Sequence, residues 1–127
     1  MNLDGPRTLT FRPPQFQVSA SNPCGLDGIE FVEFASPAPE KLADLFRAFG
    51  FSRLMHHVSR PVDLWQQGDI TFLVNREPLS FAASFAAKHG PSIASMGWRV
   101  RDANAALKAA SDRGARVRHE GDYLLDG

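Results

Sequence analysis

Residues 28–50 read GIEFVEFASPAPEKLADLFRAFG, and this stretch decides the fold. Apolar and polar side chains alternate well enough over residues 28–36 to predict a strand. A helix is predicted to follow it, with Ser36 as the N-cap and Pro37 in the first turn. Gly50 is expected to end this helix, because glycine readily adopts the backbone conformation found just beyond a helix C-terminus. The stretch therefore predicts a strand followed directly by a helix.

The same order occurs a second time in residues 92–115, SIASMGWRVRDANAALKAASDRGA. Here Asp102 is the predicted N-cap and Gly114 closes the helix. The terminating glycines, Gly50 and Gly114, are 64 residues apart (114 minus 50), and the predicted caps, Ser36 and Asp102, are 66 apart (102 minus 36). Similarity at a fixed spacing indicates a duplicated structural unit.

Between the two copies the sequence predicts three short strands and one more helix. The strands are expected at about residues 51–58, 62–67 and 70–75, and the helix at 79–91. The first unit, about residues 28–91, thus has the order β-α-β-β-β.

The second unit, about residues 92–127, is predicted to be incomplete. RVRHE (116–120) is expected to begin another strand, and about two further strands are missing relative to the first unit. We therefore predict an α+β fold of tandem βαβββ units, whose unpaired sheet edge is filled by a second copy or by a longer protein. Four prolines mark residues 1–25 as an extended N-terminal arm, which leaves 26–127 as the folded domain.

Composition excludes several classes of function. Lys+Arg and Asp+Glu both number 14, so charge gives no reason to expect nucleic acid or a membrane as partner. The single cysteine, Cys24, excludes an internal disulfide and a multi-cysteine zinc site, lacks a basic neighbour that would activate it as a nucleophile, and fits a reducing cytoplasm. The chain has no apolar run of about 18 residues, and its start lacks the order of a signal peptide.

Three segments carry a resemblance to a known family. They are NPCGLDGIEFVEFASPAPEKLADLFRAFGF, LWQQGDITFLVN and FAAKHGPSIASMGWRVRDANAALKAASDRGA. Together they resemble the N-terminal domain of 4-hydroxyphenylpyruvate dioxygenase, in the vicinal oxygen chelate superfamily that includes glyoxalase I. The resemblance runs from about Asn22 to Val117. Hydroxymandelate synthase and a dehydroshikimate dehydratase fused to such a domain are alternative parents.

The resemblance implies a longer protein in which one domain carries out the chemistry and another serves assembly. Such dioxygenases oxidise an aryl-pyruvate with O₂, using Fe(II) held by two His and one Glu in a C-terminal domain. The N-terminal domain has the fold without the metal and serves packing and assembly. A non-catalytic N-terminal domain or truncated copy is therefore expected, with no cofactor of its own and with Fe(II) in the full-length parent.

In proteins of this superfamily, the metal-binding residues typically lie on the first strand of each unit and on the last strand. By resemblance these positions match Glu30 in the first unit and Ser95 in the second, and ITFLVN (70–75) offers no carboxylate or His at its centre. Alternation places Glu30 with Val32 and groups Glu33 with Phe31 on the other face. Glu30 is thus the one position-compatible metal ligand, which does not make a site, and no catalytic residue is expected.

The pair His56 and His57 is the most conspicuous candidate outside that scheme. Neighbouring strand residues point to opposite faces, so the two rings are not expected to share one ion. Surface or interface roles are favoured over a single ligand or a substrate contact. Asp63 and Asp69 are expected at turns or strand ends, where Asp commonly binds its own backbone.

Four further side chains are weaker candidates. His89 is expected to interact with the carbonyls at a helix C-terminus. Trp65 and Trp98 could line an aryl-ligand pocket, although core or sheet-face packing is favoured. His119 lies close to the end of the sequence and indicates nothing.

Two alternatives stay open at this point. One is a stand-alone dimeric binder of small ligands, of the glyoxalase or bleomycin-resistance type, whose second copy completes the sheet. The other is a small glyoxalase-like metalloenzyme assembled across a dimer, with Glu30 as one ligand. The partner is accordingly either a C-terminal catalytic domain or a second copy of the chain.

Overall fold

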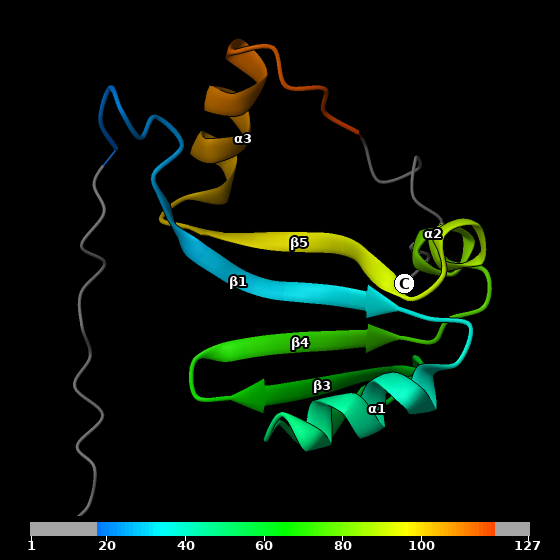
Figure 1. Cartoon of the computed structure of the whole chain (residues 1–127). Helices are drawn as coiled ribbons and strands as arrows, with labels where there is room; N and C mark the ends of the chain where they lie inside the picture. The colour runs from blue at the N-terminus through cyan, green and yellow to red at the C-terminus, as the bar shows by residue number, and fades with distance from the viewer. Residues whose placement is uncertain (1–17, 119–127) are drawn as a thin grey trace, which may run out of the picture.

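The computed structural model describes residues 18–118, which fold into one mixed sheet with three helices (Figure 1). In chain order the elements are β1 (Leu26–Ala35), α1 (Pro39–Ala48), β2 (Ser52–His56), β3 (Val62–Gln67), β4 (Ile70–Asn75), α2 (Phe81–His89), β5 (Ser92–Val100) and α3 (Ala103–Asp112). These eight elements occur in the predicted order, and the predicted α+β class is confirmed.

The sheet has the strand order β2-β3-β4-β1-β5. β1 runs parallel to β4, with Val32 beside Phe72, and antiparallel to β5, with Val32 beside Met96. The elements from β1 to β4 therefore form one complete βαβββ unit, because the last strand of the unit returns to the first. β5 and α3 begin a second unit of the same kind on the far side of β1.

A cluster of aromatic rings fills the space between α1 and the sheet. Phe46 of α1 lies 5.1 Å from Phe34 and 5.8 Å from Trp65, measured between ring centroids. Phe51 and Phe72 stack at 4.4 Å, with their planes 15° apart. Offset and edge-to-face aromatic pairs stabilise a core beyond simple area burial, so this face of the first unit is firmly packed.

Helix α2 packs through small side chains. Its Ala82 and Ala86 are buried against Ala35 at the end of β1. Ser80 caps the helix by accepting a hydrogen bond from the backbone N–H of Ala83 at 3.1 Å. Because alanine leaves little bulk at the contact, α2 lies close to the ends of β1 and β5.

The beginning of the second unit has no comparable core within residues 18–118. Helix α3 has no buried residue, and Leu107 on it is exposed. Met96 and Trp98 on β5 are also exposed, and the outer edge of β5 pairs with no strand of the described range. In Figure 1, α3 projects away from the strands, whereas α1 runs alongside β3 and β4.

The start of α1 differs from the sequence-based expectation. The N-cap is Ala38 and not Ser36, so the helix begins at Pro39. Ser36 instead accepts a hydrogen bond on its Oγ from the N–H of Ala38 at 3.0 Å, in the turn before the helix. With Ala38 as the cap, the spacing to the confirmed cap Asp102 becomes 64 residues (102 minus 38).

Two predicted strands also differ in extent. The strand expected at residues 51–58 is limited to Ser52–His56, because a turn follows it. Residues 116–118 of the expected strand 116–120 are not in a strand, and its last two residues lie outside the described range. Of the predicted arm, residues 18–25 form turns with one isolated bridge, and the division into arm and domain stays a prediction.

Candidate functional site

Three polar side chains from three strands meet on the sheet face opposite α1. Glu33 of β1 lies directly opposite Ser95 of β5 and hydrogen-bonds to the side chains of Ser95 and of Asn75, which ends β4. Burial raises the pKa of Glu33 above its ordinary value, and the hydrogen bonds from Asn75 and Ser95 partly oppose this rise. The cluster is therefore one half-buried carboxyl group held by two neutral partners.

An aromatic ring lies next to this cluster. The ring of Phe31, two residues before Glu33 on β1, covers Gly97 of β5. A Cβ atom at position 97 would collide with several carbons of that ring. Only glycine leaves room for the Phe31 ring at this position of β5, so Gly97 shapes this face of the sheet.

The donors of the Glu33 cluster can be compared with those of an iron site. The cluster supplies one carboxylate, one amide and one hydroxyl, whereas the mononuclear iron site implied for a dioxygenase parent uses two imidazoles and one carboxylate. Within residues 18–118, no three His, Cys, Asp or Glu side chains gather closely enough to hold a metal ion. The residues present do not fit that iron site.

Glu30, the metal-ligand candidate from sequence, lies elsewhere on β1. Its Oε2 accepts a charge-assisted hydrogen bond of 2.5 Å from Nε of Arg99, and both side chains are about half exposed. The residue opposite Ser95 is Glu33, three positions later. Strand alternation groups Glu33 with Phe31 on one face of β1, and this is the sequence signal for the Glu33 cluster, whereas the family resemblance matches Glu30.

A second polar cluster surrounds Asp63 on β3. Its Oδ1 lies 2.6 Å from Nδ1 of His56 on β2, and Nη2 of Arg76 lies 3.4 Å from both carboxylate oxygens. Arg53 of β2 is more distant, at 4.0 Å from Oδ2. Only 6% of Asp63 is exposed, whereas His56 and Arg53 are more than half exposed. One buried carboxylate therefore holds three side chains from β2 and from the segment after β4.

The expectation for Asp63 was correct in position and wrong in partners. Asp63 is the second residue of β3, and within the described residues its carboxylate contacts side chains of other segments. Its partners His56 and Arg76 are 7 and 13 residues away along the chain, so local turn patterns could not reveal them. Asp69 lies in the β3–β4 turn, as predicted.

The remaining histidines are placed as follows. His57 lies just beyond the end of β2, and its Nδ1 accepts a hydrogen bond from the N–H of Ser59 at 3.2 Å. His56 and His57 thus have different partners in the described part of the chain. His89 lies in the last turn of α2, with its ring 4.5 Å from that of Phe85. His119 is outside the described residues.

The two tryptophans have opposite environments. Trp65 is 1% exposed and belongs to the aromatic core, as favoured from sequence. Trp98 is 56% exposed on β5. The core position favoured for the tryptophans is therefore confirmed for Trp65, and the pocket role considered for Trp98 stays a prediction.

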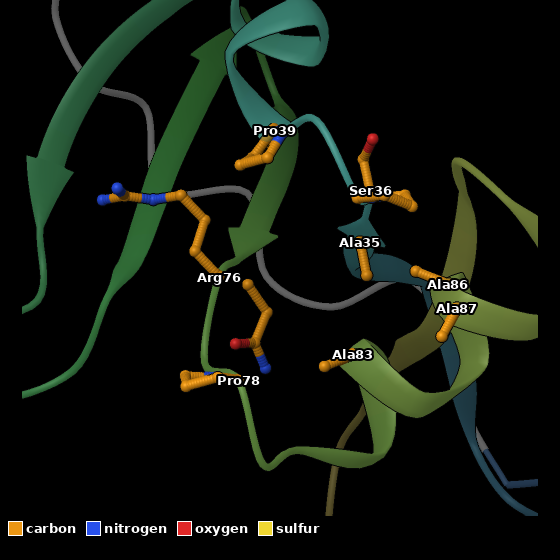
Figure 2. A pocket seen from close by; sticks show the side chains of 10 residues that line it. Ala35, Ser36, Pro39, Arg76, Pro78, Ala83, Ala86 and Ala87 are labelled. Carbon is orange, nitrogen blue, oxygen red and sulfur yellow. The ribbon is translucent and has the colours of Figure 1, made fainter.

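A pocket of about 280 Å³ lies between the start of α1 and α2 (Figure 2). Its walls are mainly alanine and proline, including Pro39, Ala83 and Ala86. In Figure 2 the side chain of Arg76 runs away from the alanines of α2. Its guanidinium instead reaches Asp63, so the charge at this rim is directed toward the neighbouring cluster.

Comparison with known proteins gives one consistent family. Residues 20–123 match a family model described as hydroxyphenylpyruvate dioxygenase, N-terminal. Protein MelA of Shewanella colwelliana is 50% identical over 98 residues, and 4-hydroxyphenylpyruvate dioxygenase of Pseudomonas sp. (strain P.J. 874) is 46% identical over 98 residues. Each match covers 77% of this chain and 28% of the relative, so the chain spans little more than a quarter of the length of these relatives.

A solved structure gives the same result. A xylose isomerase-like TIM barrel/4-hydroxyphenylpyruvate dioxygenase fusion protein superposes with a TM-score of 0.70 at 35% identity, covering 91% of this chain and 18% of that protein. Over the described residues, none of the helices has the length and apolar character needed to cross a membrane.

Proposed function

Because the chain belongs to the family of hydroxyphenylpyruvate dioxygenase N-terminal domains, we propose that it acts as the non-catalytic N-terminal domain of an Fe(II)-dependent, 4-hydroxyphenylpyruvate dioxygenase-like oxidoreductase of tyrosine catabolism. The observation that carries this proposal is the donor set of the Glu33 cluster. Glu33 is flanked there by the neutral side chains of Asn75 and Ser95, in place of the imidazoles that an iron site of this kind requires.

The role of such a domain is assembly. Within residues 18–118 the outer edge of β5 pairs with no strand, and α3 exposes Leu107. An unpaired edge and an uncovered amphipathic helix together favour a partner that adds strands. In the proposed parent this partner is the polypeptide that leads into a C-terminal catalytic domain, where Fe(II) is bound. The whole protein is proposed to be dimeric and cytoplasmic, and the free thiol of Cys24 agrees with the cytoplasmic location.

Two alternative functions belong to other classes. In one, the chain stands alone, and a second copy of β5 and α3 completes the sheet of a dimeric ligand-binding protein. In the other, a dimer forms a small metalloenzyme with Glu30 as a ligand, which requires breaking the ion pair of Glu30 with Arg99. The parent could also be a hydroxymandelate synthase or a dehydroshikimate dehydratase, and similarity to a barrel fusion protein supports the latter.

The test is an activity and metal assay on the 127-residue chain and on the longest open reading frame that contains it. For the chain alone we expect no O₂ consumption with 4-hydroxyphenylpyruvate and no stoichiometric iron. For the longer product we expect both, and Glu33→Gln should leave its iron content unchanged. Iron that is bound by the chain alone and lost in Glu33→Gln would refute the proposal, whereas loss in Glu30→Ala would support the dimeric metalloenzyme.

A further inference from the structure

The carboxyl group of Glu33 has no positively charged partner in the described part of the chain. Its hydrogen-bond partners, Asn75 and Ser95, are both neutral, and none of the ion pairs there includes it. By contrast, the buried carboxylate of Asp63 lies 3.4 Å from Arg76. Withdrawing a carboxylate from water without a cation costs free energy, and burial accordingly raises the pKa of Glu33. Its negative charge is therefore left uncompensated by the surrounding side chains.

Glu33 also has acceptor capacity that its two partners do not use. The Oδ1 of Asn75 accepts the backbone N–H of Glu77 at 2.9 Å, which leaves the Nδ2 of Asn75 to donate to Glu33. Ser95 has a single hydroxyl proton to donate. A carboxylate has about four lone-pair positions, so these two donors leave about two positions for a further donor.

One side of the Glu33 carboxyl group is open among residues 18–118. Asn75 is 6% exposed, so it lies on the buried side of the cluster. Glu33 itself is half-buried, and Ser95 on β5 is exposed. A molecule in solution can therefore approach the carboxyl group from the β5 side.

Two apolar side chains flank the carboxyl group. Phe31 lies two residues before Glu33 on the same face of β1, which places the two about 7 Å apart along the strand. Its ring is half-buried, and Gly97 leaves room for it. Leu73 of β4 is paired with Glu33 and is also half-buried. An aromatic ring attracts a cation that lies within about 6 Å of its centroid, so the ring and the carboxylate favour the same kind of ligand.

We propose that the surface formed by Phe31, Glu33, Leu73 and Ser95 binds the ammonium group of a small organic amine with an apolar body. The ammonium group donates to Glu33 beside the Phe31 ring, and the apolar body covers Leu73. Binding supplies the positive charge that the neutral partners of Glu33 lack. The site uses residues of this chain only, and it does not depend on the function proposed for the longer protein.

The probe is 2-phenylethylammonium, and 2-phenylethanol is its uncharged counterpart. Each is titrated into the ¹⁵N-labelled 127-residue chain at neutral pH and constant ionic strength, and amide chemical shifts are followed by NMR. The amine should cause saturable shifts of the backbone N–H groups of Glu33, Ser95 and Gly97. The alcohol should bind at least about fivefold more weakly, because hydrogen bonds to a charged group are stronger than those between neutral groups.

Two variants assign the contacts, and a third is the matched control. Glu33→Gln keeps the shape of the side chain and removes its charge, so it should weaken amine binding at least about tenfold. Phe31→Leu removes the aromatic ring and should weaken binding about two- to fivefold. Glu30→Gln removes the same charge from the same strand at an exposed position paired with Arg99, and it should change the affinity by less than about twofold.

Three results would overturn this proposal. One is the absence of saturable shifts with the amine. Another is equal affinity for the amine and the alcohol, since the charge would then play no part. The last is an equal loss of affinity in Glu33→Gln and Glu30→Gln, since the amine would then respond only to the net charge. The spectra themselves show whether each variant is folded, and the comparison of amine with alcohol needs no variant.

Discussion

Val32 of β1 and Met96 of β5 pair directly across the junction of the two units, and they are 64 residues apart (96 minus 32). The same spacing separates the helix caps Ala38 and Asp102 (102 minus 38). If each residue of the first unit has its counterpart 64 positions later, then Val32 and Met96 are counterparts that face each other. An approximate two-fold axis therefore passes between them, perpendicular to the sheet.

Residues that correspond across this axis differ in size, which explains why the two halves are packed so differently. The buried residues of α1, Leu42 and Phe46, correspond to Ala106 and Ala110 of α3 at the same spacing. Phe34, which contacts Phe46 in the core, corresponds to the exposed Trp98. The second unit thus has small residues on α3 where the first unit has large ones on α1, and it has a large residue on β5. Its core therefore requires a packing of side chains that differs from that of the first unit.

The first prediction concerns Glu33 and pH. Because burial raises the pKa of Glu33 in the folded state, this group stabilises the fold below its unfolded pKa and loses that contribution as pH rises through the folded pKa. Glu33→Gln, which does not titrate, should therefore gain stability relative to the unchanged chain as pH rises from about 4 to 7. Urea denaturation of both proteins at each pH measures the difference.

The matched control is Glu30→Gln, since Glu30 lies on the same strand but is about half exposed and paired with Arg99. A Glu33→Gln curve that runs parallel to that of the unchanged chain over the whole pH range would contradict the raised pKa.

The second prediction concerns Gly97. Gly97→Ala should destabilise the fold by about 1–3 kcal/mol, because the new methyl group collides with the Phe31 ring. Phe31→Leu combined with Gly97→Ala should cost less than the sum of the two single changes, since the smaller side chain makes room. Thermal or urea denaturation of the three variants checks this. Strict additivity would show that the Phe31 contact does not cause the loss.

The third prediction concerns Asp63. Asp63→Ala should cost about 1–3 kcal/mol, because a buried carboxylate that holds His56 and Arg76 is removed. Asp44→Ala is the matched control, since Asp44 is 79% exposed and forms only a surface pair with Arg47. That change should stay within about 0.5 kcal/mol. Equal costs for the two variants would show that the Asp63 cluster adds no stability.

Structural features that depend on residues close together in the sequence could be predicted, whereas features that depend on contacts between distant segments could not. The repeat was visible because caps and terminating glycines are local signals that recur, and the eight elements followed from it. The cap at Ser36 was misplaced by two residues, because Ser36 and Pro37 satisfy the same local rules as the true start at Ala38 and Pro39.

The polar clusters depend on strand pairing, which local patterns do not determine. Glu30 was matched through the family resemblance, and the β1–β5 pairing, which is irregular between Leu26 and Phe31, could not be derived from the sequence. The pairing of Glu33 with Ser95 becomes visible only once β5 is aligned with β1. Asp63 was missed for the same reason, because its partners lie on β2 and after β4.

The fourth prediction concerns Trp98, the counterpart of Phe34. In the 127-residue chain Trp98→Ala should have little effect on stability, because the side chain is 56% exposed. In a longer product whose added strands cover β5 and α3, the same change should cost at least about 2 kcal/mol, as for other large side chains removed from a core. Phe34→Ala is the reference, and it should be costly in both proteins.

If a second copy covers this surface instead, the 127-residue chain will sediment as a dimer, and Trp98→Ala will shift it toward monomer. A chain that stays monomeric, together with a longer product that is insensitive to Trp98→Ala, would show that this surface of β5 and α3 is not where the second unit is completed.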